Sequence, residues 1–146
     1  MKKLLLLLLF IPFVFSCSKE DSDEPDTLNL QIGDVYDGGI VFQVNGNGTS
    51  GMLAKTGDTG VMNWYEAMDS ESNGWYVPSI YQLGTMYDAI GQGADVINIG
   101  NFEMSKYWSS TEHSGGSGYA FNFATGESHI GYNGILNCRV RLVKPF

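Results

Sequence analysis

Two histidines are the side chains in this sequence best suited to acid–base or metal chemistry. His113 and His129 have no His, Cys or Asp close to them in the sequence. They would meet only if they flank a hairpin over residues 119–132, so a zinc or catalytic role stays open beside the simpler interpretation as surface histidines. Nucleophile-elbow, phosphate-loop and EF-hand motifs are absent from the sequence. We therefore expect no enzyme activity, no metal site and no cofactor.

A second set of residues is better suited to binding than to catalysis, and it lies in or beside a glycine-rich segment near the C-terminus. These ligand-binding candidates are His113, Tyr119, His129, Tyr132 and Asn133. Aromatic rings stack on sugars or on partner side chains, while amides and imidazoles supply hydrogen bonds. The alternative is that all five are solvated residues of a loop and a turn.

Cys17 carries the most specific chemical signal. Residues 1–16 have a short positive start and then an apolar run, which is the layout of an export signal. As a helix, the apolar residues 4–15 would rise roughly 18 Å, too little for a hydrocarbon core of about 30 Å. The run ends in Val14-Phe15-Ser16-Cys17, which resembles a lipobox. We expect cleavage before Cys17 and membrane attachment through lipid on it; an ordinary signal peptide is the alternative.

The number of cysteines favours the lipid. Cys17 and Cys138 are the only two cysteines, whereas an exported domain stabilised by disulfides normally carries several. Cys138 lies in an alternating strand pattern, so we expect it to be a small buried apolar residue.

Residues 17–30 form an acidic segment that should act as a disordered tether. They contain five acids, one lysine and few apolar side chains. The lysine and acids just after Cys17 resemble the surface-export signal of Bacteroidetes-type lipoproteins. The expected location is the outer membrane, at its cell-surface face, and a generic solvated linker is the alternative.

Residues 31–146 are long enough for one domain with a real core. From Leu28 onward eleven acids face five bases, a net charge of −6. Nucleic acid and polyanionic glycans are therefore unfavourable partners, because like charges repel. A neutral glycan, or a protein of the envelope or of a host, is the partner class that remains.

Periodicity predicts strands, two helices, then strands, which is an α+β fold with an antiparallel sheet. Residues 39–44 and 51–54 are expected to form a hairpin, and residues 119–123 and 128–132 another. Helices start at capping boxes opened by Asn63 and Ser79. The first helix should end at Asn73-Gly74 and the second at Gly91. A closing strand alternates Cys138, Val140 and Leu142 with two arginines.

Several motifs, in the same order, resemble the Lcl C-terminal-like domain and its relative, the fibrobacter major paralogous domain. They begin at Ile32-Gly33-Asp34-Val35-Tyr36-Asp37-Gly38-Gly39 and continue through Trp64 and Trp75-Tyr76-Val77-Pro78-Ser79. The most specific block is Tyr107-Trp108-Ser109-Ser110-Thr111-Glu112, and the last is Arg139-Val140-Arg141-Leu142-Val143.

This resemblance implies a C-type-lectin-like fold, with two short helices flanking a twisted antiparallel sheet and with the N- and C-terminal strands close together. It also implies a surface binding or adhesion module, since the best-known relative binds polysaccharides. The calcium and sugar motifs of the wider fold are missing. The three tryptophans are expected in the core, and Glu112 is expected to make a structural hydrogen bond. A structural accessory subunit of an envelope complex is the alternative function.

Overall fold

The computed structural model describes residues 28–131 and 136–146, which contain nine strands and two short helices. In chain order they are β1 (Val35–Tyr36), β2 (Gly39–Val44), β3 (Gly51–Lys55), β4 (Gly60–Met62), α1 (Trp64–Met68), α2 (Ile80–Ile90), β5 (Lys106–His113), β6 (Ser117–Asn122), β7 (Glu127–Ile130), β8 (Cys138–Val140) and β9 (Val143–Pro145). This mixture of sheets and two helices agrees with the α+β expectation.

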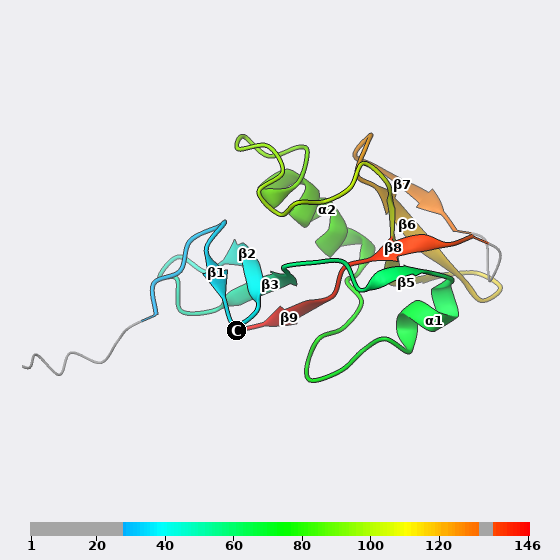
Figure 1. Ribbon diagram of the computed structural model, residues 1–146, viewed down its shortest axis with the longest axis horizontal. Helices are drawn as coiled ribbons and strands as arrows, with labels where there is room; N and C mark the ends of the chain where they lie inside the picture. Colours follow the sequence, from blue (N-terminus) through cyan, green and yellow to red (C-terminus); the bar gives the residue numbers. More distant parts are fainter. Residues whose placement is uncertain (1–27, 132–135) are drawn as a thin grey trace, which may run out of the picture.

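The strands form two sheets, not the single antiparallel sheet that the sequence predicts. The first sheet has the order β1-β2-β3-β9, and the second has the order β4-β8-β5-β6-β7 with β5 and β8 parallel. The difference arises because the predicted closing strand divides after Val140 into β8 and β9, which join different sheets. The chain therefore ends beside the N-terminal strands (Figure 1).

Both helices begin where the sequence predicts. Asn63 and Ser79 each accept a hydrogen bond from the N3 amide, and the N3 side chain accepts one from the cap amide. α1 ends at Met68, well before the predicted stop at Asn73-Gly74. No helix in residues 28–131 and 136–146 is long and apolar enough to cross a membrane.

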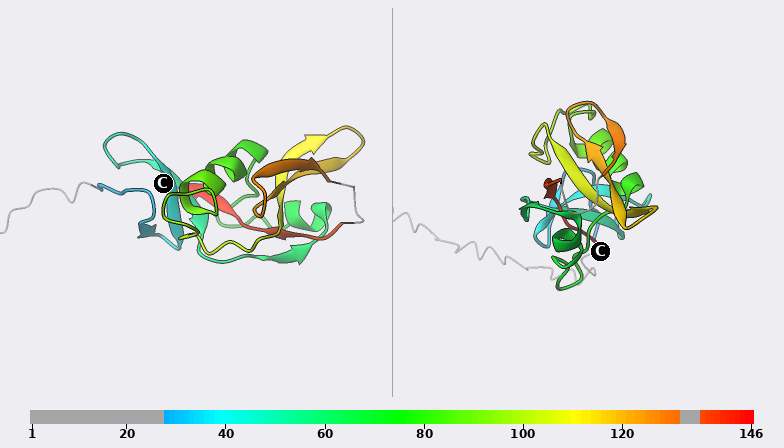
Figure 2. Two further views of the ribbon diagram at one scale, coloured as in Figure 1. Left: turned by 90° about the horizontal axis from the view of Figure 1, so that it is seen from above. Right: turned by 90° about the vertical axis from the view of Figure 1, so that its right-hand side faces the viewer.

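The second sheet has a hydrophobic cluster on each face. On β5, Tyr107 belongs to the cluster under α2, and its neighbour Trp108 belongs to the cluster under α1. α2 also packs against Phe42 of the first sheet, so it bridges both sheets (Figure 2). Trp64 and Trp108 are core residues as expected, while Trp75 is half-buried.

Candidate functional site

A groove of about 630 Å³ lies between the outer face of α2 and strands β5 to β7. The α2 residues that line it are Ile80, Tyr81, Gly84, Thr85 and Asp88, and the strand residues are Thr111, Tyr119, Phe121 and Ser128. The α2 members recur at helical spacing on a side next to the buried Leu83, Met86 and Ile90. One helix thus supplies core residues and groove residues from adjacent sides.

Gly84 sets the depth of the groove. It lies within α2, where glycine is unfavourable relative to alanine by about 0.5–1 kcal/mol. A methyl group added there would meet the Phe121 ring at 3.7 Å, an ordinary contact distance. The glycine is therefore not required by packing, and its effect is to leave the groove open.

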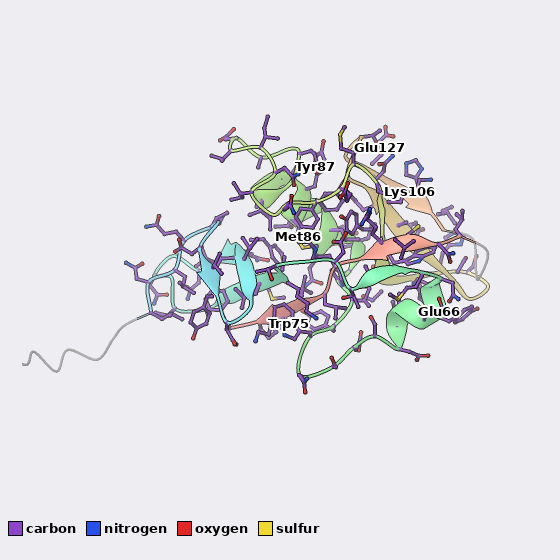
Figure 3. The ribbon with its side chains drawn as sticks, in the orientation of Figure 1. Glu66, Trp75, Met86, Tyr87, Lys106 and Glu127 are labelled. Atoms are coloured by element: carbon purple, nitrogen blue, oxygen red, sulfur yellow. The ribbon has the colours of Figure 1, made fainter. Side chains whose placement is uncertain are left out.

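The two ends of the groove are held by different contacts. At one end the Thr111 hydroxyl accepts a hydrogen bond from the Ile80 amide (3.0 Å), which fixes β5 against the start of α2. At the other end the Tyr87 ring lies so close to Gly126 that a Cβ there would come within 2.9 Å of it. Figure 3 shows Tyr87 on α2 near Glu127 at the start of β7. Contacts at both ends of the groove therefore hold α2 against the strands.

The groove combines two tyrosine rings with a small number of polar groups. Tyr81 is 85% exposed, the largest exposure among the large hydrophobic side chains of the described chain, and Tyr119 is half-buried. Among the described residues, the hydroxyls of Tyr81, Tyr119 and Ser128 have no hydrogen-bond partner. Asp88 is the single carboxylate in the lining. These groups can donate to and accept from a ligand.

The structure brings together two of the candidate residues, His113 and Tyr119. Their rings meet edge to face at 5.4 Å between centroids, and Tyr119 lines the groove. The His113 Nδ1 is 3.2 Å from the Ser114 hydroxyl. β5 extends to His113 and β6 begins at Ser117, so the connection between them is a turn of residues 114–116.

His129 lies on the opposite face of the hairpin. It pairs with Ala120, whereas Tyr119 pairs with Ile130, and directly opposite residues of an antiparallel pair share a face. Ala120 belongs to the cluster under α1, so the His129 side chain points away from the groove. Its Nε2 is buried with no hydrogen-bond partner among the described residues.

Three predicted residues lie outside the described chain, namely Cys17, Tyr132 and Asn133. The sequence-based candidates missed Tyr81, Thr85 and Asp88 of α2 altogether. A usable signal was present, since the spacing that buries Leu83 also turns Tyr81 outward in an amphipathic helix.

The cluster that most resembles catalytic machinery is a structural network. The Asp58 carboxylate accepts hydrogen bonds from the Tyr107 hydroxyl (3.0 Å), Arg139 Nη1 (3.0 Å) and Arg141 Nε (2.7 Å). Arg141 is 1% exposed, and its guanidinium also lies 4.4 Å from the Phe102 ring centroid. Every charge in this network has a partner, which suits stability more than reaction.

Other chemical groups of the described residues offer no alternative site. No group of three His, Cys, Asp or Glu side chains in residues 28–131 and 136–146 could hold a metal ion. Cys138 is buried as predicted, and burial raises the pKa of its thiol to about 11, which makes it unreactive. The Glu112 side chain is exposed and makes no hydrogen bond among the described residues, contrary to its expected structural bond.

Comparison with protein-family models and with curated proteins found no match for this chain.

Proposed function

We propose that the chain is a non-enzymatic, surface-tethered binding module whose ligand occupies the groove between α2 and β5 to β7. The observation that carries this proposal is the 85% exposed Tyr81 beside a groove that also contains Tyr119. A groove with two aromatic rings and a few convergent polar groups is the usual composition of a ligand site. The groove volume, about 630 Å³, falls within the range of small-ligand sites.

A neutral glycan is the ligand class that fits these groups. Sugar rings have an apolar C–H face that packs on a tyrosine ring, and hydroxyl groups that pair with Asp88, Thr85 and Ser128. The net charge of −6 from residue 28 onward disfavours anionic glycans. No nucleic acid and no cofactor enters this proposal.

The scaffold we propose is C-type-lectin-like, of the Lcl C-terminal-like or fibrobacter major paralogous type. The adjacency of N-terminal strands and β9, and the capping boxes at Asn63 and Ser79, support this proposal. The lipobox-like sequence at Cys17 supports lipid attachment to the outer membrane, with the domain at the cell surface.

The test is a glycan array probed with a chain that begins at Ser18. Both hydrophobic clusters are built from residues 40–143, so this chain keeps the complete described core. We expect binding to one or more neutral glycans. Tyr81→Ala and Tyr119→Ala should each weaken it by roughly tenfold or more, because each removes an aromatic contact.

Tyr65→Ala is the matched control, since Tyr65 is 51% exposed but lies on α1 at the other face of the sheet. It should bind like the parent chain. Absence of any glycan signal, or equal binding by all three variants, would contradict the proposal. Thermal unfolding of each variant separates lost binding from lost fold.

A structural accessory subunit of an envelope complex is the second candidate. It is favoured by exposed apolar side chains in the loop after α2, where Val96, Ile97 and Met104 are 66%, 74% and 73% exposed. Replacing these three by Ser should abolish co-purification of a stoichiometric envelope protein and leave glycan binding intact. If the chain is instead a binding module, the same triple substitution should leave the set of co-purifying proteins unchanged.

A further inference from the structure

β7 is an open edge of the second sheet. The four edge strands of the described chain are β1, β4, β7 and β9, and β7 is the longest of them with four residues. β9 is partly covered, because Tyr76 forms a bridge with Val143. β7 lies in the part of the molecule far from the C-terminus (Figure 2).

The hydrogen-bond pattern shows which backbone groups of β7 point outward. The Gly131 amide donates to the Gly118 carbonyl (2.7 Å), and the β6–β7 pairs continue in the same register to Glu127. Since antiparallel strands alternate, residues 127, 129 and 131 bond to β6 while Ser128 and Ile130 face away. Each of these two residues presents an N–H and a C=O with no backbone partner among the described residues.

Of the features that prevent strand pairing, this edge has only its short length and the charge of Glu127. Residues 127–130 contain no Pro and no Lys, and no bulge interrupts the β6–β7 register. Ile130 is 53% exposed, next to Tyr119 on the groove side. Glu127, at one end, is the single acidic residue of the strand.

We propose that β7 pairs antiparallel with β7 of a second copy of this chain. With His129 at the two-fold axis, Ser128 of each copy faces Ile130 of the other, and all four outward N–H groups meet carbonyls. Glu127 then faces a glycine, Gly131, so no like charges are opposed. A register that opposes the two Glu127 side chains is disfavoured by this repulsion.

Antiparallel pairing at an edge places the two-fold axis perpendicular to the sheet, so the same face of both copies points the same way. Both grooves therefore lie on one side of the dimer. If each groove binds a glycan, as the proposed function states, the dimer is bivalent. Two linked weak sites bind a repeating glycan more tightly than one.

The first test is cysteine cross-linking of the full-length chain in membranes of its expression host, with a mild oxidant. In the proposed register the two residues at position 129 form a non-hydrogen-bonded pair with Cα atoms about 4.5 Å apart, within the range for a disulfide. His129→Cys should cross-link rapidly to a dimer. Glu127→Cys is the matched control, because Glu127 is more exposed but faces Gly131 of the partner. Faster cross-linking of Glu127→Cys would overturn the register.

The second test is sedimentation equilibrium of the chain that begins at Ser18. Ile130→Pro removes an outward N–H that the β6–β7 pair does not use, so the fold should persist. The dissociation constant of the dimer should rise by roughly tenfold or more. Ile130→Thr retains the N–H and a β-branched side chain, and it should dimerise like the parent. A monomeric parent chain, or a dimer unaffected by Ile130→Pro, would overturn the proposal whether or not a glycan binds.

Discussion

The Tyr107 hydroxyl is one of two buried acids in the described core whose pKa is clearly raised; the other is the Cys138 thiol. The Tyr107 side chain is fully buried, and burial raises its pKa from 10.0 to about 12. The Asp58 carboxylate also raises the pKa, while the Glu103 amide, which donates to the hydroxyl oxygen at 2.9 Å, opposes the shift. The neutral hydroxyl is thus the form that the fold stabilises.

This shift predicts a dependence of stability on alkaline pH. The folded pKa lies above the ordinary value, so the contribution of Tyr107 is complete below pH 10.0 and is lost as pH rises towards about 12. The loss approaches about 1.4 kcal/mol for each pH unit in that interval. Urea unfolding at a series of pH values measures it.

Tyr107→Phe is the control for that prediction. At neutral pH it should reduce the free energy of unfolding by about 1–3 kcal/mol, because the Glu103 amide loses its acceptor. The difference from the parent should shrink above pH 10.0, since Phe cannot ionise. Cys138 titrates in both chains and cancels in the comparison. A difference that stays constant with pH would contradict the assignment.

α2 is the element in which stability and the proposed function compete. Its buried side chains Leu83, Met86 and Ile90 join the core, while Tyr81 and Asp88 line the groove. Gly84 lines the groove, and its Cβ position would be 3.7 Å from the Phe121 ring. A glycine in a helix interior is retained against its energetic cost where an open surface is needed.

Gly84→Ala should therefore stabilise the domain and weaken ligand binding. We expect a gain of about 0.5–1 kcal/mol in the free energy of unfolding from helix propensity. The added methyl group projects towards Phe121 and reduces the depth of the groove. Thermal unfolding and glycan titration of the same preparation measure both effects.

Gly84→Leu extends this experiment by filling the groove with a larger side chain. It should abolish binding, while Gln92→Ala outside the groove should leave binding unchanged. Full binding by Gly84→Leu would exclude the groove as the ligand site.

Across the whole molecule, Arg141 is the side chain that joins the two sheets to the long loop after α2. It lies between β8 and β9, and it donates to the carbonyls of Lys55, Gly100 and Asn101 as well as to Asp58. These groups come from segments far apart in the sequence. Their arrangement depends on one buried guanidinium.

Arg141→Met should destabilise the domain by about 3–5 kcal/mol, because it leaves buried carbonyls without donors and removes a buried ion pair. Arg139→Met is the matched control: it also loses a bond to Asp58, but the Arg139 side chain is 32% exposed against 2% for Arg141. We expect about 1 kcal/mol or less there. Similar losses in the two variants, measured by urea unfolding, would contradict the special role of Arg141.

Local spacing in the sequence was sufficient for the helix starts at Asn63 and Ser79, for both hairpins and for the burial of Cys138. Each of these depends on residues within a few positions of one another, where capping, turn and alternation preferences act directly. The acidic balance and the lipobox-like segment at Cys17 are likewise properties of the sequence alone.

Tertiary structure alone decided the rest. Alternation in the closing strand predicted that Arg141 lies on the exposed face, opposite the buried residues. In the structure the chain passes from β8 to β9 at Arg141, and this change of sheet buries the Arg141 side chain. The register of the β6–β7 pair turns His129 away from Tyr119, and the packing of α2 against the second sheet sets Tyr81 beside Tyr119. Which strands pair, and which helix face meets them, is set by packing between residues distant in the sequence, so the groove and the open β7 edge emerge only in the folded molecule.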